Sequence, residues 1–311
     1  MSFASGIKSE LLRIDNKKEC CTAAEISGIM CFGGTIYKEA ETLCLKISTE
    51  NTATARRCFS LMKQFFGLSG TLSQNHSRAG GGNAYGITVC GTEEVCRVLE
   101  ATGQRGEGDT LLRRVPQAYF ESACCRRAFL RGAFLGGGSV TNPEKEYHLE
   151  YSTPSPALAA DVEALFAEFD IGAKTVQRKT SYVVYFKNSE EIGDILNIIG
   201  AHKSYMELMN VRILKETRNR VNRKINCETA NMDKAIDAAM EQIRAITCLE
   251  KSGRLETLLP ALQETARART ENPEATMTEL GNMLGVSKSG INHRMRRLME
   301  MAEKCSQKDE E

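Results

Sequence analysis

The chain has 311 residues, and 41% of them are hydrophobic, which suits two domains with filled cores and excludes an intrinsically disordered protein. Because 41 basic residues stand against 40 acidic ones, any nucleic-acid surface has to come from local clusters of charge. We identify no signal peptide, no apolar run long enough to cross a membrane and, among 12 cysteines, no CxxC pair. These features predict a cytoplasmic protein with reduced cysteines and with no bound metal or cofactor.

The chain opens with a predicted helical arm at residues 1–18, in which Ser5 is the expected N-cap of a helix through Arg13. Two related segments follow, at about 19–103 and 121–202. Landmarks of the first segment recur in the second at one constant offset: Cys20-Cys21 as Cys124-Cys125, Gly28 as Gly132, and Gly33-Gly34 as Gly137-Gly138. This duplication predicts a pseudo-twofold domain over residues 19–202, a symmetry that suits duplex DNA as a partner.

Each segment predicts the element order αββαββα, which makes the fold class of this domain α+β. The elements expected in the first segment are helices at 21–32, 53–66 and 93–102 and strands at 42–49, 67–73 and 84–90. The elements expected in the second are helices at 122–135, 157–169 and 190–199 and strands at 147–153, 174–178 and 182–187. The glycine-rich, charged stretch at 103–109 is typical of a flexible connector.

Two vicinal cysteine pairs, Cys20-Cys21 and Cys124-Cys125, precede an apolar helix in each segment. Their symmetric placement favours small buried side chains, and redox sensing is the alternative. The sequence therefore predicts a structural role for both pairs.

The helix that opens each segment ends in small residues, with the sequences ISGIMCFGGT at 26–35 and LRGAFLGGGS at 130–139. Both stretches resemble the LAGLIDADG motif of homing endonucleases, and the resemblance implies a saddle-shaped sheet around two closely packed helices. Gly28 and Gly132 suit that packing, because a residue without a side chain lets two backbones approach each other.

In the LAGLIDADG family an acid at the end of each paired helix helps to hold Mg²⁺, and the aligned residues here are Gly33 and Gly137. Glycine offers no side-chain ligand. Glu39 and Glu41 follow the first glycine corner, but their counterparts in the second segment are not acidic. The sequence therefore predicts no catalytic residue and no metal ligand, so the chain is not expected to be an enzyme.

A basic helix is predicted at 203–225, within a connecting segment at 203–230. The residues expected to contact phosphates are those without a balancing acid one helical turn away. They are Arg218, Arg220, Arg223 and Lys224. A solvated helix face is the alternative. Residues 226–231 are expected to interrupt the helix, which places the start of the last domain at 231.

The strongest local signal is the stretch 277–298, whose spacing is that of a helix-turn-helix. Gly281 is the small residue of the first helix, Gly285 lies in the turn, and Ser287 is the expected N-cap of the second helix. Arg294 stands where the motif expects an apolar residue. DNA contacts are predicted from Ser287, Lys288, Ser289, Asn292, His293, Arg294, Arg296 and Arg297. A helical hairpin that only packs is the alternative.

A degenerate LAGLIDADG pair followed by a helix-turn-helix resembles the WhiA family of bacterial regulators, as do MSFASGIKSEL at 1–11, NCETAN at 226–231 and VSKSGINHR at 286–294. The resemblance implies sequence-specific binding of double-stranded DNA, with roles in sporulation or in cell division and chromosome segregation. It also implies a LAGLIDADG-like saddle at 19–202, followed by an all-α helix-turn-helix domain at 231–305 and a disordered tail at 306–311.

We expect a monomer that associates with the nucleoid and with no membrane, and whose other partners are regulators or division proteins. Two further classes of function compete with this interpretation: a metal-dependent DNA endonuclease, and a protein-interaction scaffold of the division machinery. Metal-stimulated nicking of DNA would indicate the endonuclease, and a missing salt-dependent affinity for DNA would indicate the scaffold.

Overall fold

The computed structural model describes residues 2–68, 70–76 and 83–306, and it has the mixed helix and sheet architecture expected from the sequence. Two compact units divide the chain, at Met1–Lys215 and Glu216–Glu311. The first unit contains both β-sheets, and the second is helical. Of the tail expected at 306–311, only residue 306 lies within the described residues. Across those described ranges, no helix is both long and apolar enough to cross a membrane.

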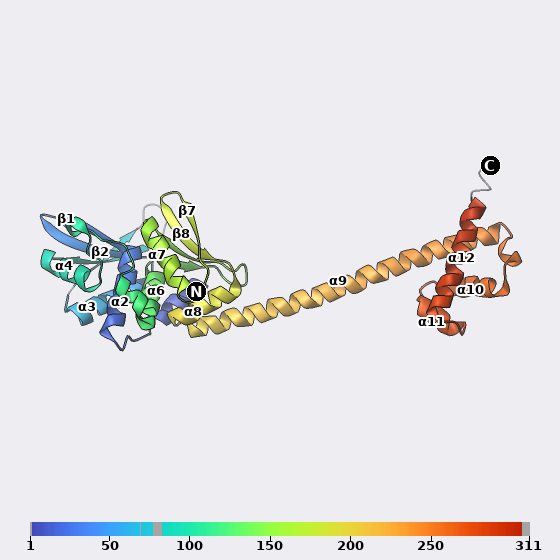
Figure 1. The fold of residues 1–311 in the computed structure, drawn as a ribbon, viewed down its shortest axis with the longest axis horizontal. Helices are drawn as coiled ribbons and strands as arrows, with labels where there is room; N and C mark the ends of the chain where they lie inside the picture. The colour runs from blue at the N-terminus through green and yellow to red at the C-terminus, as the bar shows by residue number, and fades with distance from the viewer. Residues whose placement is uncertain (1, 69, 77–82, 307–311) are drawn as a thin grey trace. The chain divides into compact units, whose positions relative to one another are not determined.

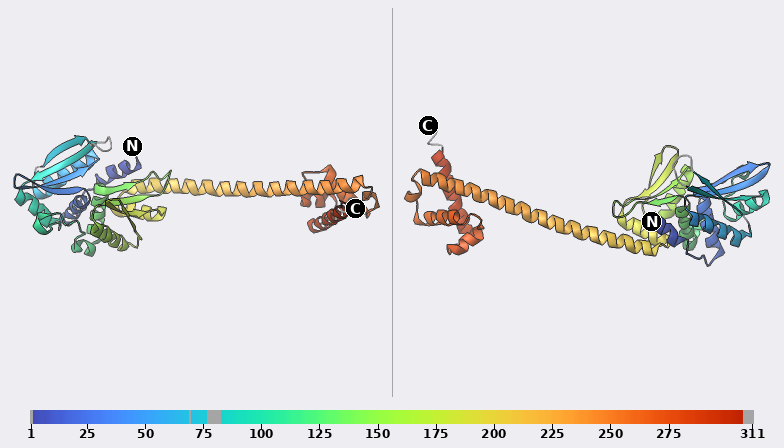
Figure 2. Two further views of the ribbon diagram at one scale, coloured as in Figure 1. Left: turned by 90° about the horizontal axis from the view of Figure 1, so that it is seen from above. Right: turned by 180° about the vertical axis from the view of Figure 1, so that it is seen from behind.

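The two sheets of the first unit share one topology, with the strand orders β1-β2-β4-β3 and β5-β6-β8-β7 and with every pair antiparallel. The strands of the first sheet are β1 (Gly34–Glu39), β2 (Thr42–Thr49), β3 (Thr71–His76) and β4 (Asn83–Cys90). Those of the second are β5 (Gly138–Val140), β6 (Leu149–Thr153), β7 (Lys174–Arg178) and β8 (Ser181–Phe186). Figures 1 and 2 show both sheets on one side of the unit, above the paired helices α2 (Glu19–Gly33) and α6 (Ala123–Gly137).

The order αββαββα is confirmed in both repeats, although only three of its four strands had been placed in each. The remaining helices of the repeats are α3 (Thr52–Phe66), α4 (Thr92–Ala101), α7 (Pro156–Ala167) and α8 (Ser189–Ile199). No strand was expected between each opening helix and the strands at 42–49 and 147–153, whereas β1 and β5 begin directly at Gly34 and Gly138. Both glycines have extended backbone, with φ of −84° at each, so each chain segment passes from helix to strand without a loop. In β1, Thr35, Ile36 and Tyr37 do favour a strand, but this short signal follows directly on the glycine corner and was not recognised as a separate element. The other strand, β5, has only three residues.

The helices α2 and α6 cross at close range, as their glycines predict. A Cβ atom built on Gly28 would overlap the carbonyl oxygen of Phe129, and one built on Gly132 would overlap the carbonyl oxygen of Glu25. Residues 21–31 of α2 are all buried, so this helix is surrounded by protein on every side. The predicted role of Gly28 and Gly132 in helix packing is therefore confirmed.

One charged group lies inside this helix pair. Glu25 of α2 is 0% exposed, and its carboxylate accepts hydrogen bonds from the guanidinium of Arg131 on α6 at 3.0 Å and from that of Arg57 on α3 at 3.3 Å. The side-chain amide of Asn16 donates a third bond, at 2.7 Å. Since a buried carboxylate is tolerated only with such partners, this cluster fixes how the two repeats are joined.

Two segments expected outside the core belong to it. Ser2, and not Ser5, caps the first helix, α1 (Phe3–Leu11): the amide of Ser5 donates to the Ser2 hydroxyl at 3.2 Å. Ile7 and Leu11 of α1 are fully buried. The stretch at 103–109 contains the short helix η1 (Glu107–Asp109) and a buried glutamine, so the prediction of a flexible connector is wrong. That glutamine, Gln104, donates to the Ser27 hydroxyl of α2 at 2.9 Å.

The cysteines are not uniformly reduced thiols in the structure. Cys44 of β2 and Cys90 of β4 are joined by a disulfide, across a pair of strands in which these two residues are directly opposite each other. The expectation that all cysteines are reduced is therefore wrong at this position. It rested on the absence of short-range cysteine motifs, which says nothing about cross-strand neighbours.

The helix α9 (His202–Lys251) runs through the stretch 226–231 without a break, so the predicted interruption is wrong. The polar residues of that stretch contain no Gly or Pro, and each costs a helix only a few tenths of a kcal/mol relative to alanine. The N-terminus of α9 is held by α1: the Glu10 carboxylate accepts from the amides of Lys203 at 2.6 Å and Ser204 at 3.0 Å.

The second unit packs three further helices against the end of α9. They are α10 (Pro260–Glu271), α11 (Met277–Met283) and α12 (Lys288–Ser306), preceded by the short helix η2 (Leu255–Thr257). Ile246 and Leu249 of α9 share one apolar cluster with Leu262 of α10 and with Met295 and Leu298 of α12. The unit therefore has a core of its own.

Candidate DNA interface

The helix-turn-helix predicted at 277–298 is formed by α11 and α12. A capping box begins α11: the amide of Glu279 donates to the Thr276 hydroxyl at 3.3 Å, and the amide of Thr276 donates to the Glu279 carboxylate at 2.7 Å. The hydrogen bond from the Thr276 backbone holds the pKa of the Glu279 carboxyl below its ordinary value. The start of α11 is therefore fixed within its own first turn.

The turn between the two helices has the three features that the sequence predicts. Gly285 adopts a left-handed φ of 64°, which favours glycine. A Cβ atom on Gly281 would lie 2.6 Å from the carbonyl oxygen of Val286, so this position needs a residue without a side chain. The Ser287 hydroxyl accepts from the amide of Gly290 at 3.2 Å and caps α12.

The inner face of α12 holds it against the rest of the unit. Ile291 and Leu298 are fully buried, and Met295 is 2% exposed. Ile291 packs with Leu280 of α11 and Ala268 of α10 in a separate small apolar cluster. Because residues three and four apart lie on one helix face, these contacts determine which side chains of α12 point outward.

The opposite face of α12 is polar and basic. The predicted contact residues that are exposed are Ser287, Lys288, Ser289, Asn292, His293, Arg296 and Arg297. Its first turn contains no acidic residue. The structure thus groups seven of the eight predicted residues on or beside one accessible surface, at the end of a helix where backbone amides also favour anions.

Arg294 is the exception among the eight. Its guanidinium donates to the carbonyl oxygen of Ala261 and to the Thr265 hydroxyl of α10, each at 3.4 Å, and the residue is only partly exposed. This explains why an arginine occupies a position of the motif that usually holds an apolar side chain. The long aliphatic part packs inward, and the charged end reaches polar groups of α10.

A second arginine, which no sequence pattern had marked, connects α10 to the loop that precedes α11. Arg269 of α10 is 2% exposed, and its guanidinium donates to the carbonyl oxygens of Ala275 at 2.7 Å and Pro273 at 3.2 Å. Burial lowers the pKa of this guanidinium. These bonds fix the loop between α10 and α11, but no local pattern in the sequence marks an arginine as buried.

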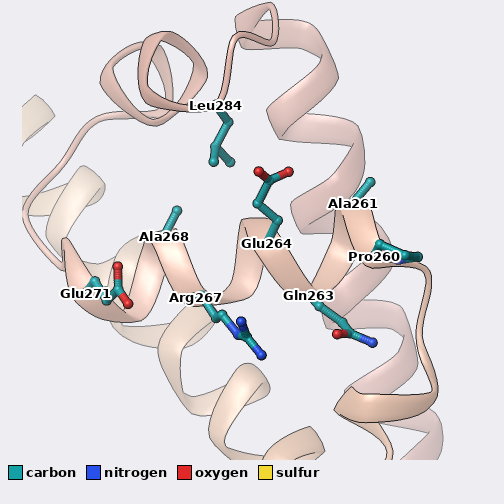
Figure 3. A pocket seen from close by; sticks show the side chains of 8 residues that line it. All are labelled: Pro260, Ala261, Gln263, Glu264, Arg267, Ala268, Glu271 and Leu284. Carbon is teal, nitrogen blue, oxygen red and sulfur yellow. The ribbon is translucent and has the colours of Figure 1, made fainter.

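A shallow pocket of about 590 Å³ lies along α10, beside the end of α11 (Figure 3). Leu284 borders it, and the Glu264 carboxylate points toward that leucine. The other charged side chains in its lining are Arg267 and Glu271. Two carboxylates against one guanidinium give this lining an excess of negative charge, which does not favour phosphate.

Several basic side chains of α9 already have partners within the protein. Arg212 pairs with Glu190 at 2.7 Å, and the ammonium of Lys215 lies over the ring of Tyr147. The ammonium of Lys224 lies 3.9 Å from the Glu228 carboxylate, one helical turn away. The prediction that Lys224 has no acidic neighbour is therefore wrong, and its cause is the helix break wrongly expected at 226–231.

The other three predicted phosphate contacts on α9 are Arg218, Arg220 and Arg223, which are exposed. Exposed apolar side chains lie on the same stretch of helix, among them Val221 and Ile225. The surface is therefore mixed, with cationic groups standing among apolar ones.

The glycine corners of the first unit are closely surrounded by backbone. A Cβ atom on Gly33 would lie 2.9 Å from the carbonyl oxygen of Ser48, and one on Gly137 would lie 2.9 Å from that of Ser152. Glu39 stands at the far end of β1 from its corner, paired in register with Thr42. The two positions that align with catalytic acids thus offer carbonyl groups of the neighbouring strands and no carboxylate.

Three family models match consecutive parts of the chain. The WhiA N-terminal LAGLIDADG-like domain matches residues 19–103, the WhiA LAGLIDADG-like domain matches 126–218, and the WhiA C-terminal HTH domain matches 221–302. A solved structure, full-length DUF199/WhiA from Thermatoga maritima, is similar with a TM-score of 0.60 and 24% identity, covering 98% of this chain and 99% of that one. That likeness shows the fold.

Two relatives are more similar in sequence. A protein of Alkaliphilus metalliredigens named "Probable cell division protein WhiA" is 40% identical over 311 residues, which cover 98% of each chain. A protein of the same name from Clostridium beijerinckii is 42% identical over 310 residues, covering 97% of this chain and 98% of that one.

Proposed function

Because the chain belongs to the WhiA family, we propose that it is a sequence-specific DNA-binding regulator of transcription that reads its sites with α12. The outward face of α12 carries this proposal: Asn292, His293 and Arg296 are exposed, while the opposite face is anchored in the core. Arginine and asparagine side chains can form paired hydrogen bonds with base edges in the major groove. Ser287, Lys288, Ser289 and Arg297 supply the adjoining phosphate contacts.

Arg294 is better placed to position α12 than to touch a base, because its guanidinium donates to α10. Arg218, Arg220 and Arg223 on α9 supply further phosphate contacts, which are independent of sequence. Lys224 contributes less than these three, because it already pairs with Glu228.

Selection of bound duplexes from a random library by the full chain tests this function. We expect one enriched motif whose affinity exceeds that of a scrambled duplex by a factor on the order of a thousand or more. Binding without an enriched motif would reduce the protein to a nonspecific DNA binder. A missing salt-dependent affinity would instead favour the scaffold of the division machinery.

The process that we propose for this regulator is cell division, with chromosome segregation and sporulation as linked processes. The support is the name of the two relatives, "Probable cell division protein WhiA". Genome-wide mapping of bound sites in the host is the test, and we expect the sites to lie beside genes of those processes. Sites scattered without relation to any promoter would contradict a regulatory role.

We also propose that the chain has no nuclease activity, because Gly33 and Gly137 stand where the paired helices of homing endonucleases carry acids. The test is incubation of supercoiled plasmid with the full chain and Mg²⁺ or Mn²⁺. Nicking that a chelator abolishes, and that persists through further purification, would overturn this part of the proposal.

The remaining expectations are also proposals. The domain limits are 1–18, 19–202, 203–230 and 231–305, with the stretch 203–230 as continuous helix instead of a linker. The protein is a monomer that follows the nucleoid. A molar mass that rises with concentration in light scattering would contradict the first point, and a fluorescent fusion that avoids DNA would contradict the second.

A further inference from the structure

Four cysteines meet where the two repeats join, at the ends of α2 and α6 that lie away from the glycine corners. Cys20 and Cys21 lie in the first turn of α2, and Cys124 and Cys125 lie in the first turn of α6. Neither pair forms a metal motif within its own segment. The pairing of the repeats brings residues together that are about a hundred positions apart in sequence, and creates a cluster that no local spacing reveals.

The sulfur atoms of this cysteine cluster are close enough to share one ligand. All four Sγ atoms lie within 4.8 Å of one another. A tetrahedral zinc site with Zn–S bonds of about 2.3 Å holds its sulfurs about 3.8 Å apart, so only small rotations of the side chains are needed. Cys125 is 4% exposed and Cys20 is exposed, so the cluster is anchored in protein and reachable from solvent.

The surroundings of the cluster favour negative charge. Both helices direct their N-terminal amides toward it, and at the described N-cap residues, Lys18 and Ser122, the side chain makes no capping hydrogen bond. The Ser122 hydroxyl and the Cys124 sulfur are 3.1 Å apart. Hydrogen bonds from Ser122 and Cys21, together with the charge of Lys18, lower the pKa of Cys124 to about 7.

Burial acts in the opposite direction on two other thiols of the cluster. Burial raises the pKa of Cys21 to about 12 and that of Cys125 to about 11. A bound metal replaces these protons, which pass to solvent as each metal–sulfur bond forms.

We propose that Cys20, Cys21, Cys124 and Cys125 together bind one thiophilic divalent cation of the zinc class, which links the two repeats. A disulfide would use two of the four sulfurs, whereas a tetrahedral cation uses all four. The site is structural, because four protein ligands leave no open position for water or substrate. It also differs from a nuclease metal site: Cys21 and Gly33 are separated by 12 residues of helix, or about 18 Å.

Cobalt titration of the full chain tests this site. The protein is stripped of metal and fully reduced under anaerobic conditions, and Co²⁺ is added. We expect one Co²⁺ per chain with the intense visible bands of a tetrahedral thiolate complex, displacement by Zn²⁺, and weaker binding at acidic pH because the thiols then keep their protons. Loss of the bands in the Cys124→Ser/Cys125→Ser variant is the expected result.

Two variants make the outcome decisive. Reduction also opens the Cys44–Cys90 disulfide, whose sulfurs lie beside Glu39, so Cys44→Ser/Cys90→Ser must keep the cobalt bands. Cys20→Ser changes an exposed residue and leaves the buried thiols in place, so it should weaken binding at least tenfold in a protein whose circular dichroism is unchanged. Cobalt bands that survive in Cys124→Ser/Cys125→Ser and in Cys20→Ser would overturn the proposal. So would reduced, folded protein that shows no bands, or a disulfide within the cluster in protein isolated under reducing conditions.

Discussion

The paired helices α2 and α6 and the second helix of the helix-turn-helix, α12, use their side chains in opposite ways. Residues 21–31 of α2 are all buried. Even the Glu25 carboxylate accepts its hydrogen bonds from partners within the unit. On α12, by contrast, an apolar stripe is buried and the basic residues His293, Arg296 and Arg297 remain exposed. A helix whose polar groups are already satisfied internally has little left with which to recognise a ligand.

The first unit therefore resembles a LAGLIDADG domain in its helix packing but not in its side-chain chemistry. The helix pair keeps the close glycine crossing of a LAGLIDADG core but has glycine where a nuclease needs acids. In the proposed function the first unit has a structural role, and recognition of sequence falls to the second unit. The following variants test that division of roles.

The largest effect is expected from Glu25→Ala. Removing this carboxylate leaves the guanidinium of Arg131 buried without its charge partner, which should lower the free energy of unfolding of the first unit by about 3 to 5 kcal/mol. The chain has no tryptophan, and its 8 tyrosines all precede residue 216, so tyrosine fluorescence during urea unfolding reports on this unit alone.

The matched control is Glu168→Ala, which removes the same charge from a pair whose carboxylate is half exposed. Glu168 contacts Arg126 at 2.5 Å, but half of its side chain is in solvent, so the expected loss is at most about 1 kcal/mol. Equal losses for the two variants would show that the Glu25 cluster is not what joins the repeats.

A smaller but still large effect is expected from Gly132→Ala. The added methyl group meets the backbone of Glu25, so the helices must separate, at a cost of about 3 kcal/mol. The same change at Gly6 on α1 meets nothing within 4 Å and should stabilise the protein by about 0.5 to 1 kcal/mol. A Gly132→Ala variant as stable as the parent would mean that the crossing is looser than the structure shows.

Changes on α12 should spare stability and alter recognition. Arg296→Ala and His293→Ala are each expected to weaken binding to the selected duplex by about 1 to 3 kcal/mol, with less effect on a random duplex, because base contacts are lost. Lys304→Ala, an exposed basic residue of the last turn of α12, serves as control. Equal losses on both duplexes would assign Arg296 and His293 to phosphates.

The features that the sequence predicted correctly depend on residues close together in the chain. The contact of Gly281 with Val286 and the cap of Ser287 on Gly290 lie within a few residues, and turn chemistry and helical periodicity encode them. The pairing of the repeats was also predictable, because two copies of one pattern imply a shared axis.

Apart from the cap of α1, the strands β1 and β5 and the Lys224–Glu228 pair, the features that were missed depend on partners far away in the chain. Glu25 and Arg131 are 106 residues apart and have no equivalents at the matching positions of the other repeat, so no periodicity marks them. Arg294 was predicted to contact DNA although the motif expects an apolar residue at its position, whereas its hydrogen-bond partners lie on α10. The cysteines were searched for metal motifs only by their spacing within each segment. Their cluster, however, forms through the packing of the two repeats.

The smallest effect is expected from the basic stretch of α9. Replacing Arg218, Arg220 and Arg223 with Gln should lower affinity for selected and random duplexes alike. Each lost phosphate contact should reduce the log–log dependence of affinity on salt by roughly 0.9. Arg212→Gln is the control, because its guanidinium pairs with Glu190 and its loss should leave the slope unchanged. A slope that also stays unchanged in the triple variant would identify this face of α9 as solvated helix, and all phosphate contacts would then have to come from the unit that contains α12.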